Sequence, residues 1–290
     1  MNSTQHQQSR SLIMTMGLIL AVSLGLNSAY GLNLDDIKSK ADELKQQRKS
    51  LEKKAKPLGL MEYSEEEEIA IGRQIAGGLL GAAPLVKDNL LQKYVNNVGR
   101  WIASQSERPD LPWHFGIINS TDINAFAAPG GYIFITLGLY QILNDEAELA
   151  GVLAHEVSHV IRKHHLKILQ QSQLVDIGGK VLTNEAGDNK QVQNLIGNGA
   201  EIVARSLDKN AEFEADRMAV VLAARAGYEA YGLPQVLQEI GHASSNDRVA
   251  LLFKTHPHSD ERLARLNGVM DSRFDRLKGK TLATRLYRIK

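Results

Sequence analysis

The stretch NDEAELAGVLAHEVSHVIRKHH, residues 144–165, predicts one amphipathic helix with its own start and stop signals. Asp145 can cap the first turn, and Glu148 three residues later completes a capping box. Gly151 costs a helix about 1 kcal/mol relative to alanine, so we expect another segment to pack closely there. The buried side of the helix is expected to consist of six aliphatic residues, which are Leu149, Val152, Leu153, Val157, Val160 and Ile161.

This predicted helix contains an H-E-x-x-H motif, formed by His155, Glu156 and His159. Residues four apart lie on one helix face, so the two imidazoles can bind a single Zn²⁺ ion. Glu156 is too close to the first ligand to join the same tetrahedron easily, but it can hold a water as a general base. The competing interpretation is a helix in which these residue types fall at these positions by chance.

Composition limits the kind of protein and the kind of metal site. The chain has 290 residues, 43% hydrophobic and 23% charged, which suits one globular domain of good size. A net charge of +1 gives no argument for binding nucleic acid or a membrane surface. The chain has no cysteine, which excludes thiol proteases, disulfides and cysteine zinc sites. Any metal must therefore be held by histidine and carboxylate.

Residues 1–31 have the layout of a secretory signal peptide. A polar start with Arg10 precedes the apolar run 12–26, and Ala29-Tyr30-Gly31 offers a small-x-small cleavage site. The run is short for a membrane-spanning helix, which needs about 20 apolar residues. The alternative is an uncleaved inner-membrane anchor, and in both cases the remainder of the chain is exported.

A charged helical arm is predicted over residues 32–62, with a short coiled coil as the alternative. Ser64 and Glu67 form a capping box that opens a helix at 65–80. The acidic first turn of this helix is expected to complement the helix dipole and not to bind metal. A further helix is expected at 88–105.

The hydrophobic period then changes from 3.6 to 2, which predicts strands at 113–118, 123–128 and 132–136. Pro129-Gly130 suits a type II turn, in which glycine supplies the positive φ. Residues 124–136 therefore predict a hairpin that leads directly into the helix with the H-E-x-x-H motif.

Two later segments have no predicted catalytic role. Residues 166–200 are helical in pattern but broken by glycines, which favours a lid-like segment. The C-terminal tail, residues 271–290, is basic, and we expect it to be solvated, with contact to anionic lipid as a minor alternative.

A second acidic helix start, DKNAEFEAD at residues 208–216, offers a third metal ligand. Glu212 and Asp216 are four apart and share one helix face, whereas Glu214 points roughly the opposite way. If Glu212 faces the metal, Asp216 can accept a hydrogen bond from the outer N–H of a ligand histidine. Two histidines and one glutamate leave a fourth position open for water. The alternative for Glu212 is an ordinary surface charge.

HEVSH, the later ExEAD-type helix and NAFAAPGG together resemble the zinc peptidases that include HtpX, the CaaX prenyl proteases and the periplasmic BepA-like proteins. The resemblance covers about residues 64–262. It implies an α+β, mainly helical gluzincin fold in residues 63–270, with a small sheet beside the zinc helix. It also implies one Zn²⁺ per chain, held by His155, His159 and Glu212, with Glu156 as catalytic base.

Two details place the chain within that group. Many members begin the third-ligand helix with Ser-Arg, where this chain has Asp208-Lys209, and an aspartate can cap a helix equally well. The membrane-embedded members carry several spanning helices, and none is predicted here after residue 31. The chain therefore resembles the soluble, exported branch, and the periplasm is the expected location.

His256-Pro257 followed by Arg262 matches a further feature of these peptidases. The imidazole and guanidinium could stabilise the oxyanion that forms on attack. Alternatively, His256 could occupy the fourth metal position in a resting state, or the segment could be a helix N-terminus with surface histidines. Pro257 fits the first turn of a helix, which places His256 at or just before its start. For His258 the interpretation as a surface histidine is favoured over a role in the site. No role is expected for the remaining histidines considered, which are His114, His164, His165 and His242.

The resemblance implies an endopeptidase of the bacterial envelope that acts on unfolded or misassembled envelope proteins. An extended substrate would pair with an edge strand formed by Asn124, Ala125, Phe126 and Ala127. The alternative from another class is a chaperone or assembly factor for outer-membrane proteins with gated or weak proteolysis, and an amidase ranks third. Expected partners are protein substrates and outer-membrane assembly machinery, with no nucleic acid and at most peripheral contact with a membrane.

Overall fold

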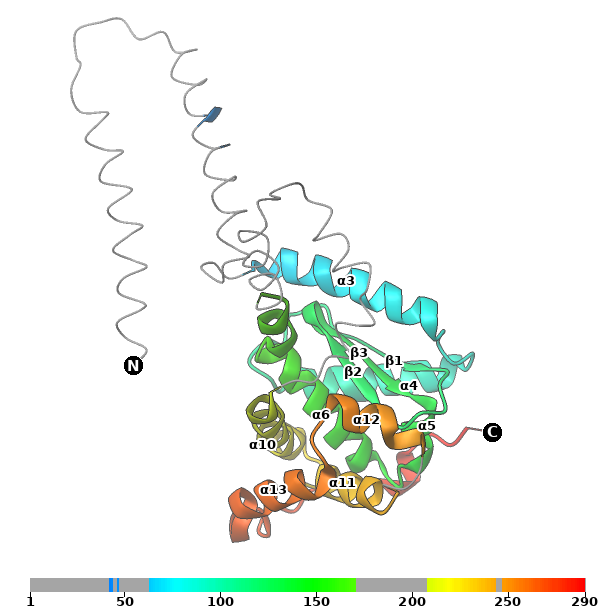
Figure 1. Ribbon diagram of the computed structural model, residues 1–290. Helices are drawn as coiled ribbons and strands as arrows, with labels where there is room; N and C mark the ends of the chain where they lie inside the picture. The colour runs from blue at the N-terminus through cyan, green and yellow to red at the C-terminus, as the bar shows by residue number, and fades with distance from the viewer. Residues whose placement is uncertain (1–41, 44–45, 47–62, 171–207, 244–246, 290) are drawn as a thin grey trace, which may run out of the picture. The chain divides into compact units, whose positions relative to one another are not determined.

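Figure 1 shows a computed structural model that describes residues 42–43, 46, 63–170, 208–243 and 247–289. The predicted signal peptide lies outside the described residues, as do almost all of the predicted arm and most of the glycine-broken segment. Within the described ranges, no helix combines the length and the apolar character needed to cross a membrane.

The described elements follow one another as helix, helix, sheet and then helices. They are α3 (Glu65–Ala82), α4 (Asn89–Ala103), β1 (His114–Ile118), β2 (Ala125–Ala128), β3 (Tyr132–Thr136), α5 (Leu137–Ile142), α6 (Glu146–Ile161), α10 (Lys209–Arg225), α11 (Gly232–His242), α12 (Ala250–Thr255) and α13 (Ser259–Phe274), with short 3-10 turns at Pro129–Gly131, Asp247–Val249 and Ala283–Arg285. This order confirms a mainly helical α+β fold with a small sheet beside the helix that carries the H-E-x-x-H motif.

Side chains that satisfy free backbone groups fix the starts of the first two helices. The Ser64 N–H donates to the Glu67 carboxylate at 2.9 Å, and the Glu67 N–H donates to Ser64 Oγ at 3.3 Å, so the predicted capping box is present. Asp88 accepts from the N–H groups of Leu90 and Leu91 at the start of α4. Caps of this kind typically contribute about 1 kcal/mol each.

The sheet has three strands in the order β1-β3-β2, with β1 parallel and β2 antiparallel to β3. The predicted hairpin is therefore present, and β2 is an edge strand. Gly130, in the turn between β2 and β3, has φ 72°, a conformation that a residue with a Cβ rarely adopts. The sequence pattern thus located both the strands and the residue that turns the chain.

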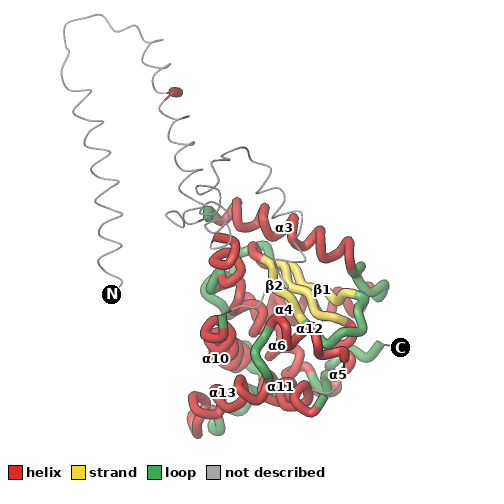
Figure 2. Tube along the Cα trace, viewed as in Figure 1, coloured by secondary structure: helices red, strands yellow, loops and turns green. Residues whose placement is uncertain are grey.

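Both faces of the sheet are covered, which makes a three-layer arrangement (Figure 2). Alternate strand residues such as Ile117, Ile133 and Ile135 join the main core with α4 and α6. The residues between them, including Phe126 and Phe134, pack in a second cluster with Ile75 and Leu79 of α3. The period of two therefore separates two apolar faces, and the strands are buried almost throughout.

The helix α3 is fastened to the turn between β2 and β3. Glu68 is fully buried, and its carboxylate accepts two hydrogen bonds from the Arg108 guanidinium and one from the Gly130 N–H. A Cβ on Gly72 would lie 1.7 Å from the Pro129 carbonyl oxygen, so only glycine permits this contact. Glu68 therefore serves as a structural anchor between α3, Arg108 and the turn.

The helix α6 is the centre of the fold, and it is buried on all sides, whereas its pattern predicted an amphipathic helix with one buried side. Every residue from Glu146 to Val160 is buried, because α6 packs against α4, α10, α11 and β2 on different sides. The helix also ends at Ile161 and not at 165. Lys163 then takes φ 55°, and a new helical segment begins at His164.

The start of α6 differs in detail from the predicted capping box. Asp145 accepts from the Glu148 N–H at 2.8 Å, as predicted. The Glu148 carboxylate, however, accepts from the Asn144 N–H at 2.6 Å, one residue before the cap. Both free groups are satisfied, but the reciprocal bond is shifted outward along the chain.

Most described residues of the C-terminal tail are exposed, as expected, but parts of the tail also pack against the domain. Leu286 is buried, and the Arg288 guanidinium donates to the carbonyl oxygens of Leu143 and Asn144. Arg285 lies 3.2 Å from the fully buried Glu146, whose carboxylate also accepts from two tyrosine hydroxyls, those of Tyr94 and Tyr228. The basic residues of the tail thus compensate the acidic start of α6.

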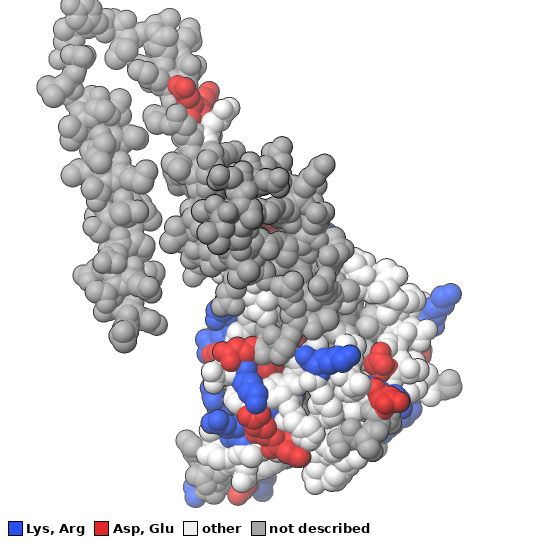
Figure 3. Space-filling model, viewed as in Figure 1, with Lys and Arg blue, Asp and Glu red and all other residues white. Residues whose placement is uncertain are grey.

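On the face drawn in Figure 3, Lys and Arg side chains of the described residues are interspersed with Asp and Glu side chains. This mixture agrees with the near-neutral net charge of the chain. A surface of this kind supplies no single-sign field over that face.

The predicted close contact at Gly151 is with α11. A Cβ built on Gly151 would lie 2.5 Å from the Leu233 backbone nitrogen and 2.9 Å from its Cα. The two helices therefore touch backbone to backbone. The site helix can be enclosed on this side only because residue 151 has no side chain.

We expect Gly151→Ala to lower the free energy of unfolding by about 1–3 kcal/mol, because the backbone of α11 must move away. Gly77→Ala in α3 is the matched control, since an added Cβ there meets nothing within 4 Å and alanine favours helix by about 1 kcal/mol. Urea unfolding followed by circular dichroism measures both. Equal stabilisation by the two substitutions would contradict the packing described here.

Candidate metal centre

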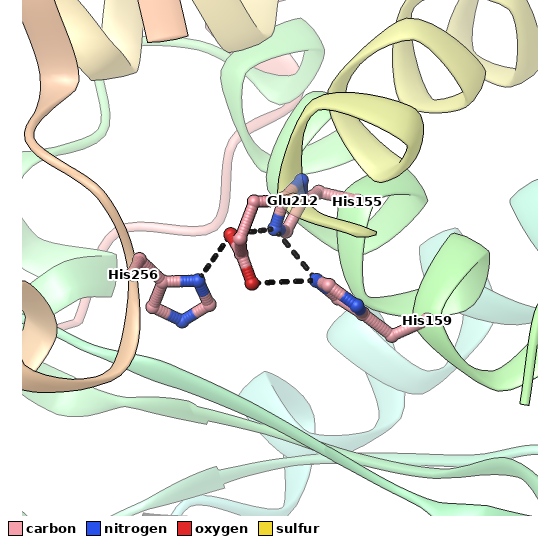
Figure 4. Close-up of side chains that lie close together, drawn as sticks. All are labelled: His155, His159, Glu212 and His256. Carbon is pink, nitrogen blue, oxygen red and sulfur yellow. Dashed lines mark hydrogen bonds and ion pairs between the residues drawn. The ribbon is translucent and has the colours of Figure 1, made fainter. Parts of the chain in front are cut away.

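Two helices and a connecting segment bring four ionisable side chains to one point (Figure 4). His155 and His159 come from α6, Glu212 from the first turns of α10, and His256 from the link between α12 and α13. All four are buried or nearly so, and one ligand atom from each lies within 4.8 Å of the others. Among the described residues, this is the group that could hold a metal ion.

The donor atoms point at one another. His155 Nε2 and His159 Nε2 are 3.0 Å apart. The Glu212 carboxylate faces both rings, with Oε2 3.6 Å from His155 Nε2 and Oε1 3.5 Å from His159 Nε2. His256 Nδ1 lies 2.6 Å from Glu212 Oε2. Lone pairs that converge in this way can be compensated by a cation among them.

An unsatisfied atom supports the fit of a metal to these residues. Glu212 Oε1 is buried and has no hydrogen-bond partner, a situation that costs about 1–3 kcal/mol or more for a charged group. Burial alone would raise the pKa of Glu212, but His256 and His159 hold it well below its usual value, so the group is a carboxylate. Two imidazoles and a carboxylate are a donor set typical of catalytic zinc.

The outer nitrogen of His155 is held by Asp216, one turn after Glu212 on α10. His155 Nδ1 lies 2.9 Å from Asp216 Oδ1. Burial favours the neutral form of this carboxyl group, yet Arg262 lowers the pKa of Asp216 to about 2. The ionised Asp216 accepts the Nδ1 proton, which leaves the lone pair of His155 Nε2 directed at the centre of the site.

Arg262 lies behind Asp216. Its Nε and Nη2 atoms donate to the two oxygens of Asp216 at 2.9 and 2.6 Å, and its side chain is buried. A bidentate pair of this kind is among the stronger ion pairs. With two donors so engaged, Arg262 is better placed to hold Asp216 than to contact a substrate.

His256 reaches the site from a different position in its segment than the sequence predicted. The helix α13 begins at Ser259, His258 is its N-cap, and Pro257 therefore lies outside the helix. His256 is the residue that ends α12. The His258 side chain is half exposed, and its Nδ1 accepts from the Asp260 N–H at the start of α13.

Glu156 is 3% exposed and lies on α6 beside the first histidine of the cluster. Burial raises the pKa of its carboxyl group, although the nearby His155 and His256 oppose the shift. Among the described residues, Glu156 has no hydrogen-bonding partner. A buried carboxyl group with a raised pKa and no competing partner among the described residues is suited to proton transfer.

The structure places one histidine at the site that the sequence did not predict. His164 Nδ1 lies 2.9 Å from His159 Nδ1, and the side chain is buried. On a continuous helix, residues five apart point in different directions, so the spacing gave no signal. The break at Lys163 brings His164 back toward His159. His165 is also buried, with its ring centroid 5.8 Å from that of His159, whereas His114 is exposed.

Peptidase family M48 matches residues 89–270, which is well over half of the chain and includes every residue of the cluster. The chain belongs to peptidase family M48. This confirms the resemblance to zinc peptidases that the HEVSH motif and its neighbours carried. It also agrees with the gluzincin-type fold, in which two histidines and a glutamate meet beside a small sheet.

Several curated proteins are similar to this chain. The "Beta-barrel assembly-enhancing protease" of Yersinia pestis is 31% identical over 208 residues, which are 69% of this chain and 43% of that protein. The Escherichia coli (strain K12) protein of the same name is 31% identical over 207 residues, 68% of this chain and 42% of the relative. The "Mitochondrial metalloendopeptidase OMA1" of Arabidopsis thaliana is 26% identical over 179 residues, 61% of this chain and 36% of the relative. The chain thus spans about two fifths of the length of these relatives.

Glu212→Gln should weaken metal binding strongly, because it removes the charge on the one oxygen donor that faces both histidines. The loss should exceed the roughly 10–100-fold that removal of an outer partner costs. Competition with a chromogenic zinc chelator measures the affinity. Glu239→Gln is the matched control, since that glutamate is exposed on α11. Unchanged affinity in Glu212→Gln would show that this carboxylate is not a ligand.

Proposed function

We propose that this chain is a zinc-dependent endopeptidase of the bacterial cell envelope, with His155, His159 and Glu212 as the zinc ligands. The observation that carries the proposal is the buried cluster in which Glu212 Oε1 has no hydrogen-bond partner. Membership of peptidase family M48 supports peptide-bond hydrolysis as the chemistry. The donor set supports zinc as the metal.

Zinc, when bound, supplies a Lewis acid that polarises the peptide carbonyl and makes water more acidic. Glu156 is the residue that handles the proton. One of its carboxylate oxygens accepts a proton from the attacking water and then donates it to the nitrogen of the leaving amine. Burial raises the pKa of Glu156, which favours its protonated form and therefore suits a group that must accept the proton before donating it.

The histidines must present lone pairs toward the metal and keep their protons on the outer nitrogens. Burial lowers the pKa of His159 well below its usual value, so that ring is neutral. Asp216 accepts the outer proton of His155, and Arg262 keeps Asp216 ionised. The contacts with Asp216 and Arg262 therefore fix the orientation of the His155 ring before any substrate arrives.

The free edge of β2 is proposed to bind the substrate backbone. The Thr136 N–H donates to the Asn124 carbonyl, and hydrogen-bonded pairs alternate along an antiparallel ladder. The N–H and C=O groups of Ala125 and Ala127 therefore point away from β3. The Ala125 N–H already donates to Asn124 Oδ1 at 2.9 Å, so an extended peptide would pair with the Ala125 and Ala127 carbonyl oxygens and the Ala127 N–H. Such backbone pairing demands little of the peptide's sequence. Because β2 packs against α6, such a peptide would run beside the helix of the ligands.

The substrates are proposed to be unfolded or misassembled envelope proteins in the periplasm. Backbone pairing tolerates many sequences, which suits a protease of protein quality control. Two of the similar proteins bear the name beta-barrel assembly-enhancing protease, which supports a link to outer-membrane assembly. Export to the periplasm rests on the signal-like pattern of residues 1–31.

A gated enzyme, acting mainly as an assembly factor, is the second candidate function. The position of His256 favours it, because this imidazole lies among the three proposed ligands and 2.6 Å from Glu212. Four protein ligands around zinc are typical of closed structural sites, whereas catalytic sites keep one position open. Hydrolysis would then require His256 to move away.

Glu156→Gln should retain zinc and lose hydrolysis, since the ligands remain but the proton acceptor is gone. Digestion of unfolded casein, with and without a chelator, measures the activity, and metal analysis of the purified variant measures the zinc. Removal of the metal from the wild type should abolish digestion, and added zinc should restore it. Casein turnover at the wild-type rate in Glu156→Gln would show the mechanism to be wrong.

His256→Ala separates the two proposed roles of this histidine by the sign of its effect. As a fourth ligand, His256 blocks the open position, so we expect the alanine variant to digest casein faster and to bind zinc less tightly. A fall of about 10²–10³ in kcat would instead assign His256 to oxyanion stabilisation. Unchanged turnover and unchanged zinc content would exclude both roles.

A further inference from the structure

We propose that His164 and Glu214 form a hydrogen-bonded pair that positions His159, as Asp216 and Arg262 position His155. This inference rests on the metal site proposed above. It assigns a role to two residues that lie outside the proposed ligand set and that the H-E-x-x-H motif does not include.

The first observation is the contact on the outer nitrogen of His159. Nε2 of this ring faces the site, 3.0 Å from His155 Nε2, while Nδ1 lies 2.9 Å from His164 Nδ1. A metal ligand needs its lone pair on Nε2, so the proton of a neutral His159 must be on Nδ1. His159 then donates this proton, and His164 Nδ1 accepts it.

The second observation fixes the tautomer of His164 itself. If Nδ1 accepts, the proton of a neutral His164 is on Nε2, which lies 3.5 Å from Glu214 Oε2. The other oxygen of Glu214 lies 2.8 Å from Arg162 Nε. The chain His159, His164, Glu214 and Arg162 therefore alternates donors and acceptors in one direction. No member is left with two donors or two acceptors facing each other.

The third observation is the backbone that places His164. Lys163 has φ 55°, which costs a residue with a Cβ about 1 kcal/mol or more. This turn ends α6 and starts the next helical segment at His164. An unfavourable backbone conformation persists only where interactions with the surrounding structure stabilise it. The contact between the two histidine rings, 5.1 Å apart at their centroids, is a direct result of this turn.

The start of α10 thus serves both ligand histidines. Glu212 faces the site, Asp216 holds the outer nitrogen of His155, and Glu214 reaches the outer nitrogen of His159 through His164. Glu214 was expected to point away from the metal, and it does. Its proposed function follows from that direction, because His164 lies on the far side of His159.

Three substitutions distinguish a hydrogen-bond acceptor from mere packing. His164→Asn keeps an acceptor, since Asn Oδ1 is attached to Cγ in the position of His Nδ1. His164→Leu has the same shape as Asn without the acceptor, and His164→Phe keeps a ring without the acceptor. His165→Phe is the control, because His165 is buried beside His159 but makes no hydrogen bond to it.

Zinc affinity at neutral pH, measured by chelator competition, is the primary readout. We expect His164→Leu and His164→Phe to lose about 10–100-fold and His164→Asn to stay within a few-fold of the wild type. His165→Phe should retain its affinity. Melting of the metal-free proteins reports folding, and if one of the apolar variants unfolds, the other supplies the comparison with Asn. Imidazole nitrogen shifts should place the proton of His159 on Nδ1 in the wild type and in His164→Asn.

Wild-type zinc affinity in His164→Leu or His164→Phe would overturn this inference but not the proposed metal site. A loss of affinity in His164→Asn equal to that in His164→Leu would have the same meaning. Failure of the wild-type protein itself to bind zinc would overturn the metal site proposed above and this inference with it. The two failures are therefore distinguishable in one set of titrations.

Discussion

The packing of α10 against α6 is the contact on which the rest of the site depends. Neither helix alone can hold a metal, since α6 supplies two histidines and α10 the carboxylates. Their contact places the Glu212 carboxylate beside Nε2 of both imidazoles and the Asp216 carboxylate beside Nδ1 of His155. The helix α11 and the sheet then enclose α6 from other sides, and Gly151 removes the side chain that would keep α11 away. The fold can thus be described as a set of layers that hold one fully buried helix in place.

Burying ionised side chains is unfavourable because they lose hydration, and pairing of opposite charges compensates for this loss. Glu212 and Asp216 are almost completely buried, yet both remain ionised because cationic or imidazole partners surround them. Arg262 is buried together with Asp216 and bonds it through two nitrogens. The breaking of a buried pair by removing one partner typically costs about 3–5 kcal/mol. The same groups that orient the ligands therefore also contribute to the stability of the folded chain.

The sequence predicted the parts of this protein that depend on local pattern. The capping box at Ser64, the positive φ of Gly130 and the close contact at Gly151 follow from rules that span a few residues. The cluster of His155, His159 and Glu212 was predicted because helical spacing and metal chemistry constrain it jointly.

Other features escaped prediction for identifiable reasons. The burial of α6 on all sides depends on which elements surround it, and a stripe of aliphatic residues does not specify this. The end of the helix at Ile161 involves no proline or glycine. Nothing in the local pattern therefore indicated that Lys163 would take a positive φ and interrupt the helix. His164 was missed for the same reason. The packing of parts of the C-terminal tail was missed because its basic residues compensate Glu146, more than a hundred residues earlier in the chain.

The composition of β2 has a consequence for how an extended peptide would align on it. Three of the four residues of this strand are alanines, and the groups that point away from β3 belong to Ala125 and Ala127. Alanine methyl groups form no deep pockets, so this edge can form backbone hydrogen bonds but does not select particular side chains of a bound peptide. Pairing along a strand repeats every two residues, and a polypeptide shifted by two residues would make the same bonds. If this edge binds an extended substrate as proposed, registers that differ by two residues place different peptide bonds of that substrate at the same point of the site.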